Sequence, residues 1–339
     1  MKAIKFFAIT AMAAAMFTSC SNEDELSQSN YPSDNIIRIT AGVNNAKTRA
    51  EGAGVTQLEK PLSLTVVNKN DDATLAAKYT YVNKEFSKDE NGVWKCSETL
   101  LWQNDETSVD IVAFAPAQGA KFNGVCDNDG NIQPITYSIA ANQSTSSDNN
   151  DLLYNYTPGF VPSGTNLDKD GKLSIQMNHA FCMIDIVVTL GTEFNVSGIP
   201  TTSPITEVTL GGTKIDATVD VTNTNNIVTT SSTDAAKDIT ATPGAFTKPE
   251  NDNKEKPCIS RFSCIAIPQT VGKNTFKVSL MTAGKLYEWT SAEPVELKSG
   301  YRYTLKLSMG NDVVLLKGGS ISATPWTEGD TGDKPLETD

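Results

Sequence analysis

The feature that most constrains this chain is a period-2 alternation of apolar and polar residues, repeated in many short runs. Successive side chains of a β-strand point to opposite faces, so this alternation indicates strands with one buried face. Glycine, asparagine, proline and aspartate separate the runs, as they do in turns between strands. Helical periodicity is scarce. The sequence therefore predicts an all-β protein of β-sandwich architecture, and 339 residues suit two such domains.

One predicted strand is apolar on both faces. Residues 109–115 are nearly all apolar and stop at Pro116, which is typical of a buried central strand. The other expected strands alternate. They span 37–43, 62–67, 78–86, 93–102, 173–177, 180–190, 208–210, 215–221, 260–267, 275–281, 286–289, 301–307 and 313–316.

Two stretches lack a clear alternation. Residues 151–171 are polar and contain two prolines and Asp-Gly-like turns. We expect a domain boundary there, with an N-terminal sandwich over 35–170 and a C-terminal sandwich over 171–339. Residues 201–247 are rich in threonine, asparagine and serine, and this composition predicts long surface loops on the second domain.

The N-terminus has the features of an export signal. Lys2 and Lys5 precede an uncharged run of about a dozen residues, which is too short for an ordinary transmembrane helix. Small residues and then Cys20 follow, and this arrangement resembles a bacterial lipobox. The resemblance implies that a signal peptide over 1–19 is removed and that the thiol of Cys20 is diacylated. A plain signal peptide with an incidental cysteine is the alternative.

An acidic tract, Ser-Asn-Glu-Asp-Glu, occupies residues 21–25 directly after that cysteine. It opens a linker that we expect to cover residues 20–34. The tract resembles the surface-export signal of Bacteroidetes lipoproteins, and a solvated linker is the alternative. No other run approaches 18 apolar residues, so the lipid would be the only membrane attachment.

Composition excludes several kinds of function. There are 28 basic and 40 acidic residues and a net charge of −12, which argues against a nucleic-acid partner. His179 is the only histidine, so mechanisms that need two imidazoles are excluded, and its apolar surroundings favour a structural role. The motifs of nucleophile elbows, P-loops and zinc proteases are absent. We therefore predict no enzyme and no cofactor, although paired carboxylates of a glycosidase stay open because their spacing is spatial.

A loop at Asn166, Asp168 and Asp170 has the ligand spacing of the first half of an EF-hand. Its twelfth position would be Met177, where calcium needs a glutamate, so a polar turn is the better interpretation and no metal site is predicted. Asp127 opens a similar turn.

The cysteines other than Cys20 are odd in number and lack CxxC spacing. Cys182 lies in an apolar run and is expected to be buried, whereas a bridge between Cys258 and Cys264 is left open. The remaining two are Cys96 and Cys126.

Several short segments resemble, in chain order, the fimbrillin family of Bacteroidetes, which includes the FimA- and Mfa-type pilins. They are Ile37 to Val43 followed by Lys47-Thr48-Arg49; Leu101-Trp102 and then residues 109–116; Asp151-Leu152-Leu153-Tyr154; His179-Ala180 and the strand after it; Tyr301 to Leu307; and Pro325-Trp326. Each match is weak alone, but together they cover residues 36–327.

This resemblance implies two tandem transthyretin-like Greek-key sandwiches and a structural pilus subunit. The lipoprotein precursor would reach the cell surface, and an Arg-specific protease would cut between Arg49 and Ala50, with Lys47 as a second possible site. The first strand would then leave, and a strand of a neighbouring subunit would fill its groove. The residues of the displaced strand that face the core would be Ile37, Ile39, Ala41 and Val43.

The tail after Trp326 is acidic and has no alternating apolar run, so it makes a poor donor strand. The better candidate is Val313, Val314, Leu315 and Leu316, continuing to Ile321. Expected partners are other fimbrial subunits in a head-to-tail polymer, the protease, and a surface receptor that the sequence does not identify. The expected location is the fimbrium, with the precursor anchored by lipid in the outer membrane.

The alternative function is a cell-surface lipoprotein that does not polymerise and binds glycan or host protein through the loops of its sandwiches. Trp94 and Trp102 could form a stacking platform for such a ligand, but aromatics on one strand face are more often part of a core.

Overall fold

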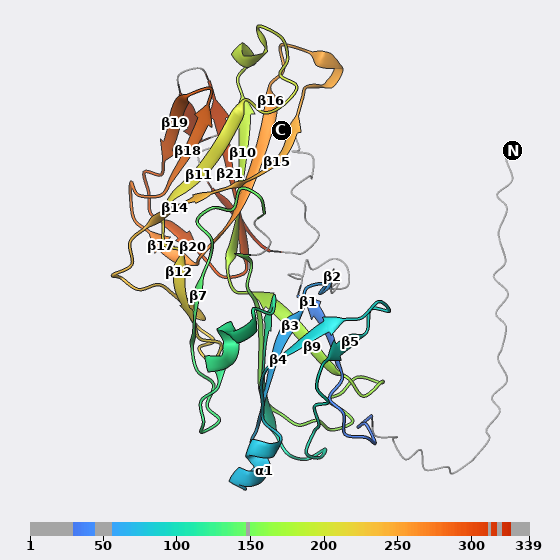
Figure 1. The fold of residues 1–339 in the computed structure, drawn as a ribbon. Helices are drawn as coiled ribbons and strands as arrows, with labels where there is room; N and C mark the ends of the chain where they lie inside the picture. Colours follow the sequence, from blue (N-terminus) through green and yellow to red (C-terminus); the bar gives the residue numbers. More distant parts are fainter. Residues whose placement is uncertain (1–29, 45–55, 147–149, 311–312, 317–320, 327–339) are drawn as a thin grey trace, which may run out of the picture.

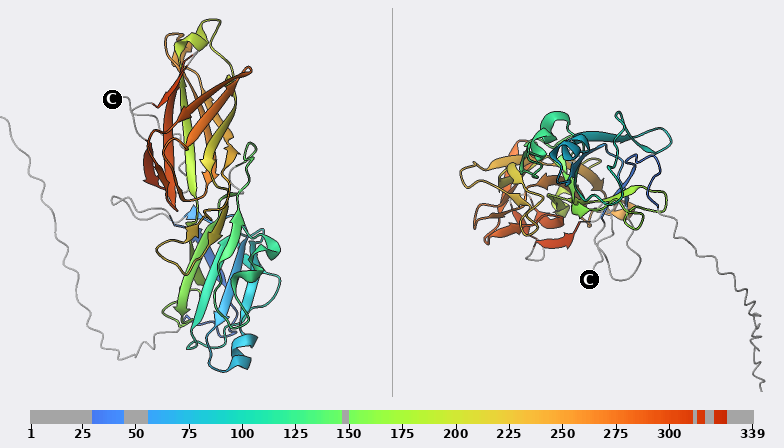
Figure 2. Two further views of the ribbon diagram at one scale, coloured as in Figure 1. Left: turned by 90° about the vertical axis from the view of Figure 1, so that its left-hand side faces the viewer. Right: turned by 90° about the horizontal axis from the view of Figure 1, so that it is seen from below.

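The computed structural model describes residues 30–44, 56–146, 150–310, 313–316 and 321–326. The predicted signal peptide and most of the acidic linker lie outside these ranges. Strands dominate the described residues, so the all-β class is confirmed, and two elongated β-sheet lobes are stacked end to end (Figure 1, Figure 2). None of the helices in the described ranges is long and apolar enough to cross a membrane.

The elements are as follows. The strands are β1 (Ile39–Val43), β2 (Thr56–Gln57), β3 (Leu62–Asn68), β4 (Tyr81–Lys88), β5 (Trp94–Cys96), β6 (Val109–Ala115), β7 (Ile135–Ser138), β8 (Leu153–Phe160), β9 (Leu173–His179), β10 (Cys182–Leu190), β11 (Ile205–Thr213), β12 (Asp216–Val219), β13 (Val228–Thr229), β14 (Lys237–Thr240), β15 (Thr242–Thr247), β16 (Cys258–Ala266), β17 (Gln269–Val271), β18 (Lys277–Thr282), β19 (Lys285–Thr290), β20 (Val295–Leu297), β21 (Tyr301–Met309), β22 (Val314–Leu316) and β23 (Ser322–Pro325). The helical segments are α1 (Ala73–Lys78) and the 3-10 turns η1 (Gly119–Val125), η3 (Thr192–Asn195) and η4 (Glu250–Asp252).

The lower lobe is built on one sheet with the strand order β2-β1-β9-β8-β6-β3-β4-β5 (Figure 1). The apolar strand β6 lies inside this sheet between β3 and β8, as its sequence predicted. The core of this lobe includes Trp102, Ile111 and Met177, which are almost fully buried. β1 pairs in parallel with β9, whereas its pairing with β2 is antiparallel.

The upper lobe packs two sheets against each other. One has the order β15-β16-β10-β21-β22, with β23 also paired to β21, and the other has the order β14-β11-β18-β19. β10 lies in the middle of the first sheet, antiparallel to β16 and parallel to β21. Every second residue of β10, from Cys182 to Leu190, is buried, which is the pattern of a half-buried strand.

Smaller sheets join the two lobes. β7, from the first half of the chain, pairs with β12 of the second half, and β13 adds to β12. β17 and β20 form a separate two-stranded ribbon. The larger core cluster accordingly contains Phe114 and Tyr137 together with the side chains of the upper lobe. The division into domains at residues 170 and 171 stays a prediction; β9, which follows this point, pairs with strands of the lower sheet.

Three expectations about local structure were wrong. Residues 78–86 do not begin as a strand, because Lys78 ends helix α1, which Asp72 caps by accepting hydrogen bonds from the amides of Thr74 and Leu75. Within 93–102 only β5 is a strand. The polar stretch 201–247 was expected to be long loops apart from the strands at 208–210 and 215–221, but it also contains β13, β14 and β15, because threonine suits a pleated strand and these segments find pairing partners.

Candidate functional site

The predicted displaced strand, β1, is an interior strand of the lower sheet. Five of its residues pair with β9, from Ile39 opposite Leu173 to Val43 opposite Met177, and two pair with β2. The side chains of Ile37, Ile39 and Val43 are 4%, 4% and 2% exposed. Ala41 is half-buried. β1 therefore supplies both backbone hydrogen bonds and apolar contacts to the sheet that it would leave.

The segment before β1 has a separate set of partners. The amide of Ile37 donates to the carbonyl of Leu100 at 2.9 Å, and the amide of Trp102 donates to the carbonyl of Asn35 at 2.8 Å. These bonds attach the segment to the chain after β5. The first strand is thus held at two places, and both would have to open for it to leave.

An ion pair lies at the point where these two sets of contacts meet. Both terminal guanidinium nitrogens of Arg38 donate to the carboxylate of Asp34, at 2.9 and 2.6 Å. The side-chain hydrogen bonds from Arg38 hold the pKa of Asp34 well below its usual range, and the same bonds raise the pKa of Arg38. The carbonyl of Arg38 also accepts from the amide of Leu173 at 2.8 Å. Arg38 is therefore engaged through its side chain and through its backbone.

β1 and β2 are consecutive antiparallel strands, so the chain between them forms the connection of a hairpin. That connection, residues 45–55, contains the predicted processing residues Arg49 and Ala50 and lies outside the described residues. The predicted lipidation residue Cys20 also lies outside them. These three assignments stay predictions.

The end of β1 meets the C-terminal segment in a small cavity of about 260 Å³ at the junction of the lobes. On one side, the side-chain amide of Asn44 donates to Asn178 at 2.9 Å. On the other side, the indole of Trp326 stacks on the imidazole of His179, with ring centroids 3.7 Å apart and planes 10° apart. The backbone amide of Trp326 donates to Gly300 at 2.8 Å.

His179 has a structural place, as its surroundings in the sequence predicted. Its Nδ1 lies 3.0 Å from a carboxylate oxygen of Asp151, and both side chains are buried. A buried carboxylate beside an imidazole is paired, as the low polarity of an interior requires. Asp151 comes directly before Leu152, whose carbonyl accepts from the amide of Ala180, so this pair holds β8 and the β9–β10 connection together.

The candidate donor strand lies at an edge of the upper lobe. β22 and β23 both pair with the same side of β21. Leu316 is opposite Leu307 and Ser322 is opposite Thr304, so β22 and β23 are two separate short strands on this edge of β21. Val314 is 7% exposed, but Val313 and Leu315 are 50% and 58% exposed. This edge is short, broken and partly apolar on its outer face.

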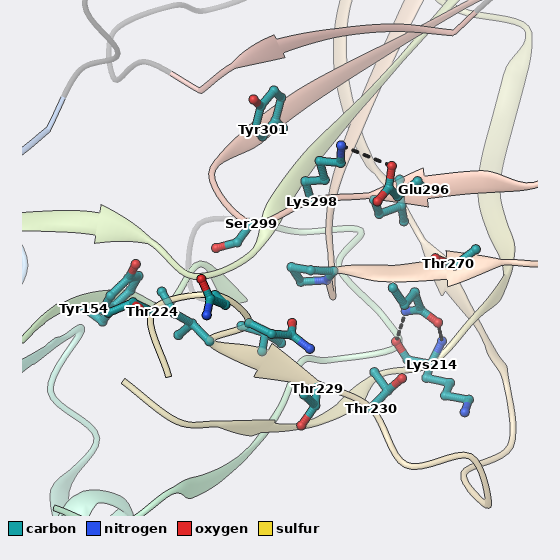
Figure 3. A pocket seen from close by; sticks show the side chains of 17 residues that line it. Tyr154, Lys214, Thr224, Thr229, Thr230, Thr270, Glu296, Lys298, Ser299 and Tyr301 are labelled. Carbon is teal, nitrogen blue, oxygen red and sulfur yellow. Dashed lines mark hydrogen bonds and ion pairs between the residues drawn. The ribbon is translucent and has the colours of Figure 1, made fainter. Parts of the chain in front are cut away.

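A second concave feature is a polar groove of about 780 Å³ beside the lobe junction (Figure 3). Tyr154 of β8 and Tyr301 of β21 lie at one end, and Lys298 and Glu296 form an ion pair of 3.1 Å on the rim. The opposite wall comes from the β12–β13 hairpin. The lining residues are Tyr154, Lys214, Thr224, Asn225, Asn226, Ile227, Val228, Thr229, Thr230, Pro268, Gln269, Thr270, Glu296, Leu297, Lys298, Ser299 and Tyr301.

Sequence reasoning missed this groove and the His179–Trp326 stack. The groove is assembled from β8, the β12–β13 hairpin, β17 and β20, and no sequence signal announces that these distant segments meet. The two tyrosines were read only as strand residues. The threonine-rich stretch was read as a loop.

The loop that was weighed as a calcium site and the predicted turn at Asp127 are both explained by their own hydrogen bonds. The carboxylate of Asp168 accepts from the amides of Asp170 and Lys172, and that of Asp127 accepts from the amides of Asp129 and Asn131. Such bonds are those of Asx turns. Within the described residues no group of histidine, cysteine, aspartate and glutamate side chains could hold a metal ion.

The five cysteines of the described residues are free, so the possible bridge between Cys258 and Cys264 is not formed. Cys182 is buried as predicted, and burial raises the pKa of its thiol. Burial also raises the pKa of Cys264 to about 12. Trp94 and Trp102, weighed as a stacking platform, belong to the lower core.

Solved structures with a similar architecture are known. A similar solved structure is a candidate cell adhesion protein of Bacteroides ovatus, with 16% identity over 87% of this chain and 99% of the other and a TM-score of 0.60. A candidate cell adhesion protein of Bacteroides uniformis has 16% identity over 87% and 100% and a TM-score of 0.54. A fimbrial protein of Bacteroides vulgatus has 12% identity over 86% and 99% and a TM-score of 0.50. At these identities the likeness establishes the fold alone.

A comparison with curated proteins found no match. The family model described as fimbrillin-like matches residues 48–326, which includes the strands from β2 to β23. This chain therefore belongs to the fimbrillin-like family.

Proposed function

We propose that this chain is the precursor of a structural fimbrial subunit that is processed after Arg49 and polymerises by donor-strand exchange for adhesion. Membership of the fimbrillin-like family supports a fimbrial or adhesion subunit. The partners would be other subunits of the same fimbria and an Arg-specific surface protease. No catalytic role is part of the proposal.

The position of β1 is the observation that carries this proposal. β1 lies between β9 and β2, and the peptide that links it to β2 contains Arg49. A cut in that link would leave β1 attached by non-covalent contacts alone. Its departure would expose unpaired backbone groups on β9 and β2 above an apolar trough, which a strand from another subunit could fill.

The packing of β1 also indicates how it would leave. Burying an isoleucine or valine side chain contributes about 1.5–3 kcal/mol, and Ile37, Ile39 and Val43 are all buried. The cut strand would therefore remain bound on its own. We expect the incoming strand to displace it residue by residue, so that few pairs are open at any time.

The incoming strand would be Val313 to Leu316 of a neighbouring subunit. Its outer side chains are already half exposed, and within the described parts of the chain only one of its edges is paired, so its release costs less than the release of β1. Because donor and acceptor lie in different lobes, the exchange is head-to-tail, and such contacts build a filament where their rotation does not close a ring. The precursor would be held in the outer membrane through lipidated Cys20 until it is cut.

A second function is a cell-surface lipoprotein that stays a monomer and binds glycan or host protein through its sandwich loops. The complete pairing of β1 favours this role for any chain that is not cut, because the lower lobe then needs no further strand.

The test is treatment of the purified full chain with an Arg-specific protease, followed by N-terminal sequencing and an unboiled gel. We expect a new N-terminus at Ala50 and a ladder of high-mass species. The Arg49→Ala chain should give neither, and Lys47→Ala, two residues away, is the matched control that should behave as the native chain does. Cutting and polymerisation of Arg49→Ala would refute the proposal. A native surface form that retains a blocked Cys20 and forms no ladder would favour the second function.

A further inference from the structure

We propose that the polar groove beside the lobe junction binds a neutral oligosaccharide. This site goes beyond the fimbrial role and does not depend on strand exchange. The groove volume of about 780 Å³ falls within the roughly 300–1,000 Å³ that is typical of small-molecule sites. Segments of both lobes line it, and the meeting of two lobes is a common place for such sites.

The wall formed by the β12–β13 hairpin carries polar side chains that the protein does not use itself. Thr224, Asn225 and Thr229 are exposed, and within the described residues their side chains make no hydrogen bond. Thr270, on β17 of the β17–β20 ribbon, is also exposed, and its hydroxyl makes no hydrogen bond within the described residues. Hydroxyls and amides each offer both donors and acceptors. A sugar hydroxyl needs both, and it would replace water at these positions without loss of hydrogen bonds.

The floor of the groove is apolar. Val228, Pro268 and Leu297 are lining residues that are buried. The half-buried rings of Tyr154 and Tyr301 close one end (Figure 3). A pyranose presents C–H faces between its hydroxyls. A groove with an apolar floor, tyrosine rings and a hydroxyl and amide wall matches both parts of that surface, since a tyrosine ring offers an apolar face with a polar edge.

The charged side chains of the groove are few: Lys214, Glu296 and Lys298. The ammonium of Lys298 pairs with Glu296 at 3.1 Å, and that of Lys214 donates to the carbonyl of Ser231. Among the described lining residues Lys214 is then the one cation without a carboxylate partner, and its ammonium is engaged by a backbone carbonyl. The chain as a whole carries a net charge of −12, which also disfavours anionic ligands. The ligand class is therefore neutral and not sialylated.

The scaffold of the groove is already formed. The side-chain amide of Gln269 donates to Lys214 at 3.1 Å and to Ile267 at 3.0 Å, and its oxygen accepts from the amide of Lys214 at 2.9 Å (Figure 3). This residue ties β17 to the chain between β11 and β12 and fixes the spacing of the two walls. Little ordering of the protein is needed on binding, and such preorganisation favours affinity.

The experiment is saturation-transfer-difference NMR of the full chain with maltotriose, triacetylchitotriose, lacto-N-tetraose and 3′-sialyllactose at millimolar concentration. We expect transfer to at least one neutral sugar and none to sialyllactose. The double variant Asn225→Ala/Thr229→Val should weaken binding at least tenfold. The double variant Asn91→Ala/Thr99→Val removes the same groups from exposed positions of the lower lobe and should bind as the native chain does.

Three results would overturn the proposal. They are the absence of transfer to every neutral sugar, transfer to sialyllactose alone, and equal binding by the groove variant and its control. Because Tyr301 also packs against the upper core, its ring is tested by Tyr301→Phe, which keeps the stacking face. This variant should retain binding within about threefold, and a tenfold loss would contradict the stacking role of the ring.

Discussion

The two strands that the proposed mechanism would move are held in opposite ways. β1 is paired along both edges, and Ile37, Ile39 and Val43 are buried. β22 is paired along one edge, is three residues long, and has Leu315 more than half exposed. The strand that must leave is therefore attached more firmly than the strand that would be donated.

This difference separates two requirements of strand exchange. A precursor must not aggregate before it is cut, so its groove must be well filled, and β1 fills it. A donor must be available without unfolding its own lobe, and the broken edge of β21 provides this. An exposed edge is a risk for unwanted pairing, and here the edge consists of two short strands, β22 and β23.

The largest effect is expected for a truncation in β1. Ile39→Ala should lower the free energy of unfolding by about 2–5 kcal/mol, because it leaves a cavity in the lower core. Leu315→Ala removes a side chain of similar size that is 58% exposed and should change that free energy by no more than about 0.5 kcal/mol. Urea unfolding of the full chain, followed by far-UV circular dichroism, measures both. Equal losses would show that the contrast between the two strands does not exist.

A smaller effect is expected at the contact that fixes the end of the C-terminal edge. Trp326→Ala removes the stack on His179, and an aromatic pair contributes about 0.5–1.5 kcal/mol beyond its buried area. Amides of β23 should exchange with solvent at least tenfold faster, because the packing of the buried indole is lost as well, as measured by hydrogen exchange and mass spectrometry. Trp326→Phe should restore most of the protection. If the amides of β1 open equally, the two strands are coupled through the junction and not independent.

The smallest effect concerns the ion pair before β1. Arg38→Ala should raise the pKa of Asp34 toward the usual value of about 3.9, because the hydrogen bonds from Arg38 lower it in the native chain. Carboxyl carbon NMR measures this, with the distant exposed Lys273→Ala as control. Since folding lowers the pKa of Asp34, the ion pair stabilises the folded chain at neutral pH. This stabilisation is lost as the pH falls from the usual pKa toward the lowered native pKa. An unchanged pKa of Asp34 in Arg38→Ala would show that the pair does not form in solution.

Much of the fold was readable because alternation is a local property. β3, β6, β10, β16, β18 and β21 lie where their patterns predicted them. The alternation was misleading where a helix cap or core packing determined the local structure. Asp72 caps a helix in place of the start of a strand, and the apolar residues after Cys96 pack into the lower core without forming a ladder.

The candidate site also has parts that local patterns predicted and parts that they did not. The buried face of β1 was predicted from its alternation, and Ile37, Ile39 and Val43 are in the core. Arg49 and Cys20 come from local motifs, and they stay predictions because they lie outside the described residues. The groove could not be predicted from sequence, because Tyr154 and Thr229 meet only after β7 has paired with β12 and the lobes have come together.

The all-β class, the buried strand β6, the structural role of His179 and the resemblance to fimbrillins were therefore contained in the order of the residues. They rest on side-chain period, composition and short motifs, which do not depend on distant partners. The neighbours of β1, the broken edge at β22 and the groove were decided only by folding. The place of β1 depends on pairs such as Ile39 with Leu173, the groove on pairs such as Ser138 with Asp216, and the edge at β22 on its pairing with β21, which sets Leu316 opposite Leu307. The alternation within a strand does not identify the segment with which that strand pairs.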